Sequence, residues 1–174
     1  MSRLLNGASM LLVALSVAAF ILILGSSRNV STSYQHKYDL TTNANRFMNG
    51  SGYLTDEVRA YATTGDQLHY DNYWNEINNL KNRDIGVANM REIGITEQEE
   101  GLIAEMSDLS NNLVPKEEAA MELTQQGKTA DAIEAVYGSE YESTIANIKS
   151  TQSEFLELLD TRTSASIAAA TVQK

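Results

Sequence analysis

Six aromatic side chains and one arginine have the residue types from which a ligand pocket can be built. They are Arg59, Tyr61, Tyr70, Tyr73, Trp74, Tyr137 and Tyr141. Aromatic rings supply apolar walls with a polar edge, and a fixed guanidinium can bind a carboxylate or stack on a planar group. These seven residues are the predicted ligand-binding set, for a small carboxylate or a planar molecule. The alternative is that the aromatic rings close one end of a helical domain, with the tyrosine hydroxyls in water and Arg59 paired with an acid.

The sequence offers few groups that could carry out catalysis. The chain has no cysteine, which excludes thiolate metal sites and cysteine nucleophiles. His36 and His69 are the only histidines, and neither has a second ligand at the spacing of a metal site. Six glutamates on polar helical faces are expected to face solvent: Glu97, Glu99, Glu100, Glu117, Glu118 and Glu122. We therefore expect no enzyme activity, no catalytic or metal site and no cofactor.

The net charge restricts the partners. Lys and Arg total 13 against 23 Asp and Glu, so the chain carries a formal charge of -10. Such a chain repels the phosphate backbone of DNA and RNA. Nucleic acid is therefore not an expected partner.

The N-terminal segment differs in composition from the rest of the chain. Leu4 to Leu24 contains no charged residue, and its 21 residues would cover the roughly 30 Å of hydrocarbon in a bilayer as a helix. With Arg3 inside, residues 1–27 are predicted to be a transmembrane helix, and residues 28–174 an extracytoplasmic sensor domain at the cell membrane. A cleaved signal peptide is the alternative, because Met10 to Leu24 has the length of an apolar signal core and Gly25-Ser26-Ser27 could form a cleavage site.

The remaining chain has the composition and periodicity of helices. One apolar ladder with spacings of four and three predicts the first helix: Leu40, Ala44, Phe47, Ser51, Leu54, Val58 and Tyr61. Gly65 and Asp66 are typical of a helix end and of the next N-cap, so a second helix is expected over 66–94. Its expected apolar face consists of Tyr70, Tyr73, Trp74, Ile77, Leu80, Val87 and Met90.

The later helix boundaries also have local signals. Thr96 and Glu99 form a capping box that opens a third helix over 96–127, with a kink or restart expected at Pro115. A short helical piece over 129–137 precedes a fourth long helix from Ser139 onward. We therefore predict an all-α fold: a membrane-anchored, antiparallel, up-down-up-down four-helix bundle with the aromatic residues at its membrane-distal end.

A short motif resembles the helical extracellular sensor domains of bacterial transmembrane receptors, of the four-helix-bundle and third CHASE type. The residues that match the motif are Arg59, Tyr61, Thr64, Gly65, Asp66 and Tyr73. The leading apolar segment and the acidic helical remainder also resemble the N-terminal portion of a methyl-accepting chemotaxis protein. That family's second membrane helix, HAMP module and signalling hairpin are missing, so we expect a sensor fragment that ends before the second span.

The resemblance implies a function and partners. It implies ligand sensing for a bacterial chemoreceptor, with a small helix displacement carried across the membrane to a cytoplasmic module. The implied partners are a small molecule or a ligand-loaded binding protein, a second copy of the chain, and the membrane. Two alternatives remain open: a sensor for a histidine kinase or diguanylate cyclase receptor, and an anchored helical interaction protein without transmembrane output.

Overall fold

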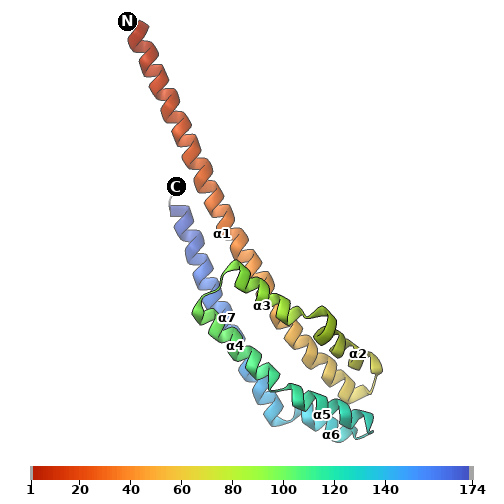
Figure 1. Cartoon of the computed structure of the whole chain (residues 1–174). Helices are drawn as coiled ribbons and strands as arrows, with labels where there is room; N and C mark the ends of the chain where they lie inside the picture. Colours follow the sequence, from red (N-terminus) through yellow and green to blue (C-terminus); the bar gives the residue numbers. More distant parts are fainter. Residues whose placement is uncertain (1, 173–174) are drawn as a thin grey trace. The chain divides into compact units, whose positions relative to one another are not determined.

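The computed structural model describes residues 2–172, and the side chains of residues 12–20 and 28–172. Seven α-helices and one π-helical segment follow one another without a strand in this part of the chain: α1 (Ser2–Thr64), α2 (Gln67–Asn75), η1 (Glu76–Leu80), α3 (Asn82–Ile93), α4 (Glu97–Asn111), α5 (Val114–Gln125), α6 (Thr129–Tyr137) and α7 (Ser139–Val172). Figure 1 shows the helices in chain order. The predicted all-α class is confirmed.

The predicted transmembrane span is contradicted. Among the described residues, no helix is both long enough and apolar enough to cross a membrane. Leu4 to Leu24 lies inside α1, which continues without interruption to Thr64. The membrane localisation and the membrane partner inferred from that span lose their support with it.

The chain divides into two compact units. The first combines the described parts of 1–38 and 160–174, and the second is Asp39–Leu159. In the first unit, the Lys37 ammonium donates to Asp160 Oδ1 at 2.6 Å and to Ser164 Oγ at 2.9 Å, which links α1 to α7. The second unit contains the apolar core and all seven predicted ligand-binding residues.

The core of the second unit consists of two apolar clusters. The tyrosine cluster is formed by Leu54, Val58, Tyr61, Ala62, Tyr73, Leu113, Ala120, Met121, Ala132, Val136 and Tyr141. The phenylalanine cluster is formed by Leu40, Ala44, Phe47, Met48, Val87, Met90, Ile103, Met106, Phe155 and Leu159. Every residue of the predicted first ladder except the half-buried Ser51 is buried in one of the two. The ladder therefore identifies the inward stripe of α1 correctly.

Local sequence signals account for most helix ends. Gly65 has φ +68°, and Asp66 Oδ1 accepts the Leu68 N–H at 3.0 Å, so the predicted turn and N-cap are confirmed. Thr96 and Glu99 make both hydrogen bonds of the predicted capping box. Pro115 lies in the first turn of α5, where its missing N–H costs no helical hydrogen bond. The predicted restart at the proline is confirmed.

The predicted second helix is interrupted by η1 and a left-handed residue. Lys81 has φ 49° and ψ 38°, and α3 begins immediately after it. The Glu76 side chain is buried and accepts both the backbone N–H and the side-chain amide of Asn82, each at 2.8 Å. The wider turn of η1 also changes the helical phase. Leu80, predicted on the apolar face, is therefore 47% exposed, whereas Glu76 points inward.

The left-handed conformation of Lys81 gives a stability prediction. A side chain in this region costs about 1 kcal/mol relative to glycine. Because Lys81 is exposed, Lys81→Gly should raise the free energy of unfolding by about 0.5 to 1 kcal/mol in a urea titration. Lys81→Ala removes the same side chain without relieving the backbone, so equal stabilisation by Ala would contradict the explanation.

Helices α1 and α3 approach each other closely at a glycine. A Cβ atom added to Gly86 of α3 would lie 2.7 Å from the Asn43 carbonyl oxygen and 2.9 Å from the Phe47 nitrogen, both on α1. Gly50 lies inside α1, and a Cβ there would meet Arg83 atoms at 3.1 and 3.2 Å. The close approach of the two helices therefore explains why position 86 is a glycine, and in part why position 50 is one.

Candidate functional site

A buried carboxylate lies at the centre of the predicted ligand-binding residues. Glu117, in the first turn of α5, is 3% exposed. The Tyr73 hydroxyl donates to its Oε2 and the Tyr141 hydroxyl donates to its Oε1, both at 2.7 Å. Through these two hydrogen bonds, Glu117 of α5 links α2 and α7. The prediction of a solvent-facing side chain is wrong for Glu117 and also for Glu99, which is 0% exposed.

Burial dominates the electrostatics of this cluster. Desolvation raises the pKa of Glu117 above its usual range, against the opposing effect of the two tyrosine hydrogen bonds and of Arg83 and Arg59. Burial, and then the adjacent Glu117 charge, raises the pKa of Tyr73 and Tyr141 above the ordinary tyrosine value. Both tyrosines therefore remain neutral hydrogen-bond donors in the ordinary pH range.

Arg59 lies against the start of α7. Its Nε donates to the Val136 carbonyl oxygen at 2.9 Å, and its Nη2 donates to Glu142 Oε1 at 2.6 Å. The guanidinium carbon lies 4.5 Å from the ring centre of Tyr137 and 5.2 Å from that of Tyr141. Arg59 thus has an acidic partner, as the alternative interpretation of the aromatic residues expected.

Three consecutive residues hold the first turn of α7. Glu140 forms an ion pair with Lys116 at 2.6 Å, Tyr141 donates to Glu117, and Glu142 accepts from Arg59. Two of these partners belong to α5 and one to α1. The N-terminal end of α7 is therefore tied to two neighbouring helices.

The other predicted residues form an aromatic stack along α2. The ring centres of Tyr61 and Tyr70 are 5.4 Å apart, those of Tyr70 and Trp74 6.3 Å, and those of Tyr73 and Trp74 5.3 Å. The structure thus divides the seven predicted residues into this stack and the group of Arg59, Tyr137 and Tyr141. Glu117 connects the two groups through Tyr73 and Tyr141. Within each group the side chains contact one another.

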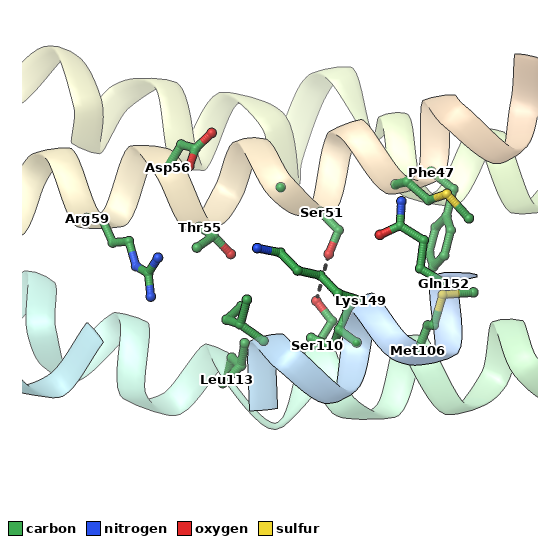
Figure 2. A pocket seen from close by; sticks show the side chains of 14 residues that line it. Phe47, Ser51, Thr55, Asp56, Arg59, Met106, Ser110, Leu113, Lys149 and Gln152 are labelled. Atoms are coloured by element: carbon green, nitrogen blue, oxygen red, sulfur yellow. Dashed lines mark hydrogen bonds between the residues drawn. The ribbon is translucent and has the colours of Figure 1, made fainter. Parts of the chain in front are cut away.

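A pocket of about 140 Å³ opens beside this cluster, between α1, α4 and α7. Figure 2 shows the polar side chains of Ser51, Thr55 and Arg59 on α1, with Lys149 reaching toward them from α7. Its full lining is Phe47, Met48, Ser51, Gly52, Thr55, Asp56, Arg59, Met106, Ser110, Leu113, Ile145, Ile148, Lys149 and Gln152. Of the seven predicted residues, only Arg59 lines the pocket.

The pocket combines an apolar wall with a polar side, which carries hydroxyl groups, the two cations Arg59 and Lys149 and the carboxylate of Asp56. Ser51 Oγ and Ser110 Oγ lie 3.3 Å apart, within hydrogen-bond distance. Lys149 is exposed and forms no ion pair with any described residue, in contrast to Arg59. Ammonium and hydroxyl donors beside methionine and isoleucine side chains suit a small organic anion with an apolar group. A small carboxylate ligand remains a prediction, and most of the lining residues differ from the predicted set.

The sequence prediction missed two residues of the site, although their spacing from neighbouring apolar residues indicates their positions. Glu117 lies four residues after Leu113 and three before Ala120, so it occupies an inward position of the predicted third ladder. Lys149 lies four residues after Ile145, at the edge of the apolar stripe of α7. In both cases the residue type alone predicts exposure. His69 Nδ1 bonds to Glu57 Oε2 at 2.7 Å.

The motif that resembles receptor sensor domains has a local structural role. Thr64 Oγ1 accepts the Asp66 N–H at 3.1 Å, Gly65 takes the left-handed conformation, and Asp66 caps α2. These residues form the turn that brings Arg59 and Tyr73 into the same cluster. No protein-family model, no curated protein and no solved structure matches this chain.

Proposed function

We propose that this chain is a ligand-sensing module of a bacterial chemoreceptor-type protein and binds a small organic anion in the pocket between α1, α4 and α7. The observation that carries the proposal is the Lys149 ammonium, which lies beside an apolar wall and forms no ion pair with any described residue, in a chain of net charge -10. A local cation in an acidic protein attracts an anion selectively to that place. The resemblance of the Arg59 to Tyr73 motif to bacterial sensor domains supports the assignment to signalling.

In the proposed protein, the helices of the second unit have a specific arrangement. The second unit would form an antiparallel four-helix bundle from the 39–64 segment of α1, the α2–α3 pair, the α4–α5 pair and the 139–159 segment of α7. Two close contacts support this arrangement: Gly86 of α3 against α1, and the Thr151 hydroxyl of α7, which donates to Glu105 of α4 at 3.3 Å. A ligand in the pocket would then contact three of the four members.

Ligand binding would act through α7. The pocket wall on α7 includes Ile145, Ile148 and Lys149, and the helix continues to Val172. A ligand can shift α7 only by binding one of its positions more tightly than the other, and displacements of about 1 to 2 Å are sufficient in helical switches. We propose that this displacement is the signal, and that a second copy of the chain is part of the signalling assembly.

The proposed pocket is tested by titrating the chain with butyrate in a calorimeter. Lys149→Met keeps the apolar stem of the side chain and removes the charge, so butyrate affinity should fall about tenfold through loss of one charge-assisted hydrogen bond. Butyramide, which has the same size and no charge, should bind at least about tenfold more weakly than butyrate to the unmodified chain.

Lys128→Met is the matched control. Lys128 is also an exposed lysine, and it does not line the pocket. Its substitution should leave butyrate affinity unchanged. An equal loss in both variants would indicate a general charge effect and would remove the pocket from the proposal, and so would an unchanged affinity after Lys149→Met.

A further inference from the structure

A second cavity of about 340 Å³ lies between α1, η1, α3 and the α4–α5 region. It shares no lining residue with the pocket that contains Lys149. Leu54, Ile77 and Val114 give it an apolar wall, and Trp74 and Arg83 supply hydrogen-bond donors. The proposed sensing function does not use this cavity.

Two residues that line this cavity each carry a buried donor without an acceptor. Trp74 Nε1 and Arg83 Nε are both buried, and neither has a hydrogen-bond partner in the part of the chain that the structure describes. Buried polar groups in proteins are almost always satisfied, so two unsatisfied N–H groups that line one cavity call for a common explanation. An acceptor group of a ligand in the cavity satisfies donors of this kind.

The surrounding charges indicate which acceptor is suitable. Glu76, Asp84 and Glu118 line the same cavity, against the two cations Lys81 and Arg83. A carboxylate ligand would add a further negative charge to this group, whereas a carbonyl oxygen accepts the same hydrogen bonds without one.

The indole ring is held in place for such a contact. Trp74 packs edge-on against Tyr70 and Tyr73, with interplanar angles of 61° and 81°. Tyr73 is in turn fixed by its hydrogen bond to Glu117. A donor held in this way loses little conformational entropy when it binds an acceptor.

We infer that this cavity is a second ligand site, which binds a small neutral molecule bearing an amide or lactam carbonyl. Trp74 Nε1–H and Arg83 Nε–H donate hydrogen bonds to the ligand, and Leu54, Ile77 and Val114 contact its apolar part. This cavity and the anion pocket share no lining residue, so an experiment can exclude ligand binding at one of them without excluding it at the other.

Trp74 is the only tryptophan of the chain, which gives the site its own spectroscopic signal. In a ¹⁵N-labelled sample of the full chain, one indole N–H resonance reports on the cavity. Three probes with the same ring are titrated: benzamide, benzoate and benzylamine. Benzamide should move the indole proton downfield to saturation, with at least about fivefold higher affinity than benzoate. Benzylamine, a cation without an acceptor, should cause no downfield shift of this proton, even where the carboxylates of the lining bind it.

Variants separate the hydrogen bonds from general packing. Trp74→Phe keeps the ring packing and removes the N–H, and Arg83→Met removes the guanidinium. Each should weaken benzamide binding about fivefold in ligand-observed NMR, while a melting curve checks that the variant is folded. Glu118→Gln should strengthen benzoate binding, because it removes one negative charge from the lining of the cavity. Lys149→Met should affect neither benzamide nor benzoate binding at this cavity, because Lys149 belongs to the other pocket.

The titrations and the variants each have a result that would overturn the inference. No saturable shift with benzamide, or tighter binding of benzoate than of benzamide to the unmodified chain, overturns it. Undiminished benzamide binding to folded Trp74→Phe and Arg83→Met also overturns it. Loss of butyrate binding in Lys149→Met with benzamide binding retained supports two separate sites.

Discussion

Glu117→Leu should lower the free energy of unfolding by about 2 to 5 kcal/mol. Leucine has a similar volume but leaves the buried Tyr73 and Tyr141 hydroxyls without their acceptor. Each unsatisfied buried hydroxyl costs about 1 to 3 kcal/mol. The loss is measured as a shift of the urea unfolding midpoint at constant slope.

Two controls separate this effect from a general loss of charge. Glu118→Leu changes the adjacent, exposed glutamate and should shift stability by no more than about 0.5 kcal/mol. The triple variant Glu117→Leu, Tyr73→Phe, Tyr141→Phe removes donors and acceptor together and should be more stable than Glu117→Leu alone. A triple variant less stable than the single one would refute the explanation by unsatisfied hydroxyls.

Glu117 should also make stability depend on pH. Because burial raises the pKa of Glu117 in the folded state, the folded chain retains this proton at pH values where the unfolded chain, with an ordinary carboxyl pKa near 4.5, has lost it. Stability from this group is therefore complete below the unfolded pKa and falls as pH rises toward the folded pKa, by at most about 1.4 kcal/mol per pH unit.

Glu117→Gln isolates this contribution. The amide cannot lose a proton, so the stability of the variant relative to the unmodified chain should increase as pH rises from 4 through the neutral range. Urea titrations of both proteins at several pH values measure the difference. A difference that is constant with pH, or one that decreases as pH rises, would be inconsistent with a raised pKa.

Gly86→Ala should be the second strongly destabilising change, with a loss of about 2 kcal/mol. The new methyl group would lie 2.7 Å from the Asn43 carbonyl oxygen, and that oxygen is backbone that cannot rotate away. Helix α3 must then move from α1, which loosens the packing of Phe47 and Val87 in the phenylalanine cluster. A lower melting temperature measures the loss.

Gly101→Ala is the matched control and should have the opposite sign. Gly101 is exposed in α4, and a Cβ there meets no atom within 4 Å. Alanine should therefore stabilise the chain by about 1 kcal/mol through helix propensity alone. Equal and favourable effects at both glycines would show that α1 and α3 are not in close contact at Gly86.

Helix positions in this chain could be predicted because the signals are local. Gly65, Asp66, Thr96 and Glu99 act on backbone groups within three residues, so their effect does not depend on the rest of the fold. The apolar ladder of α1 is also local, since one stripe of a helix meets whatever packs against it.

The features that could not be predicted depend on partners distant in the sequence. Glu117 is buried because Tyr73 and Tyr141 donate to it, 44 and 24 residues away. The η1 segment and the left-handed Lys81 depend on the buried Glu76, whose carboxylate accepts the backbone N–H and the side-chain amide of Asn82 at the start of α3. A glutamate alone predicts exposure, and only its position on the ladder between Leu113 and Ala120 indicates otherwise.

The two ion pairs and the hydrogen bond of Glu140, Tyr141 and Glu142 restrict how the first turn of α7 can move. Sliding α7 along its axis would have to displace all three interactions at once, because they lie in the same turn at 2.6 to 2.7 Å. Tilting about that turn keeps these three interactions together, so the first turn of α7 restricts sliding of the helix more than it restricts tilting.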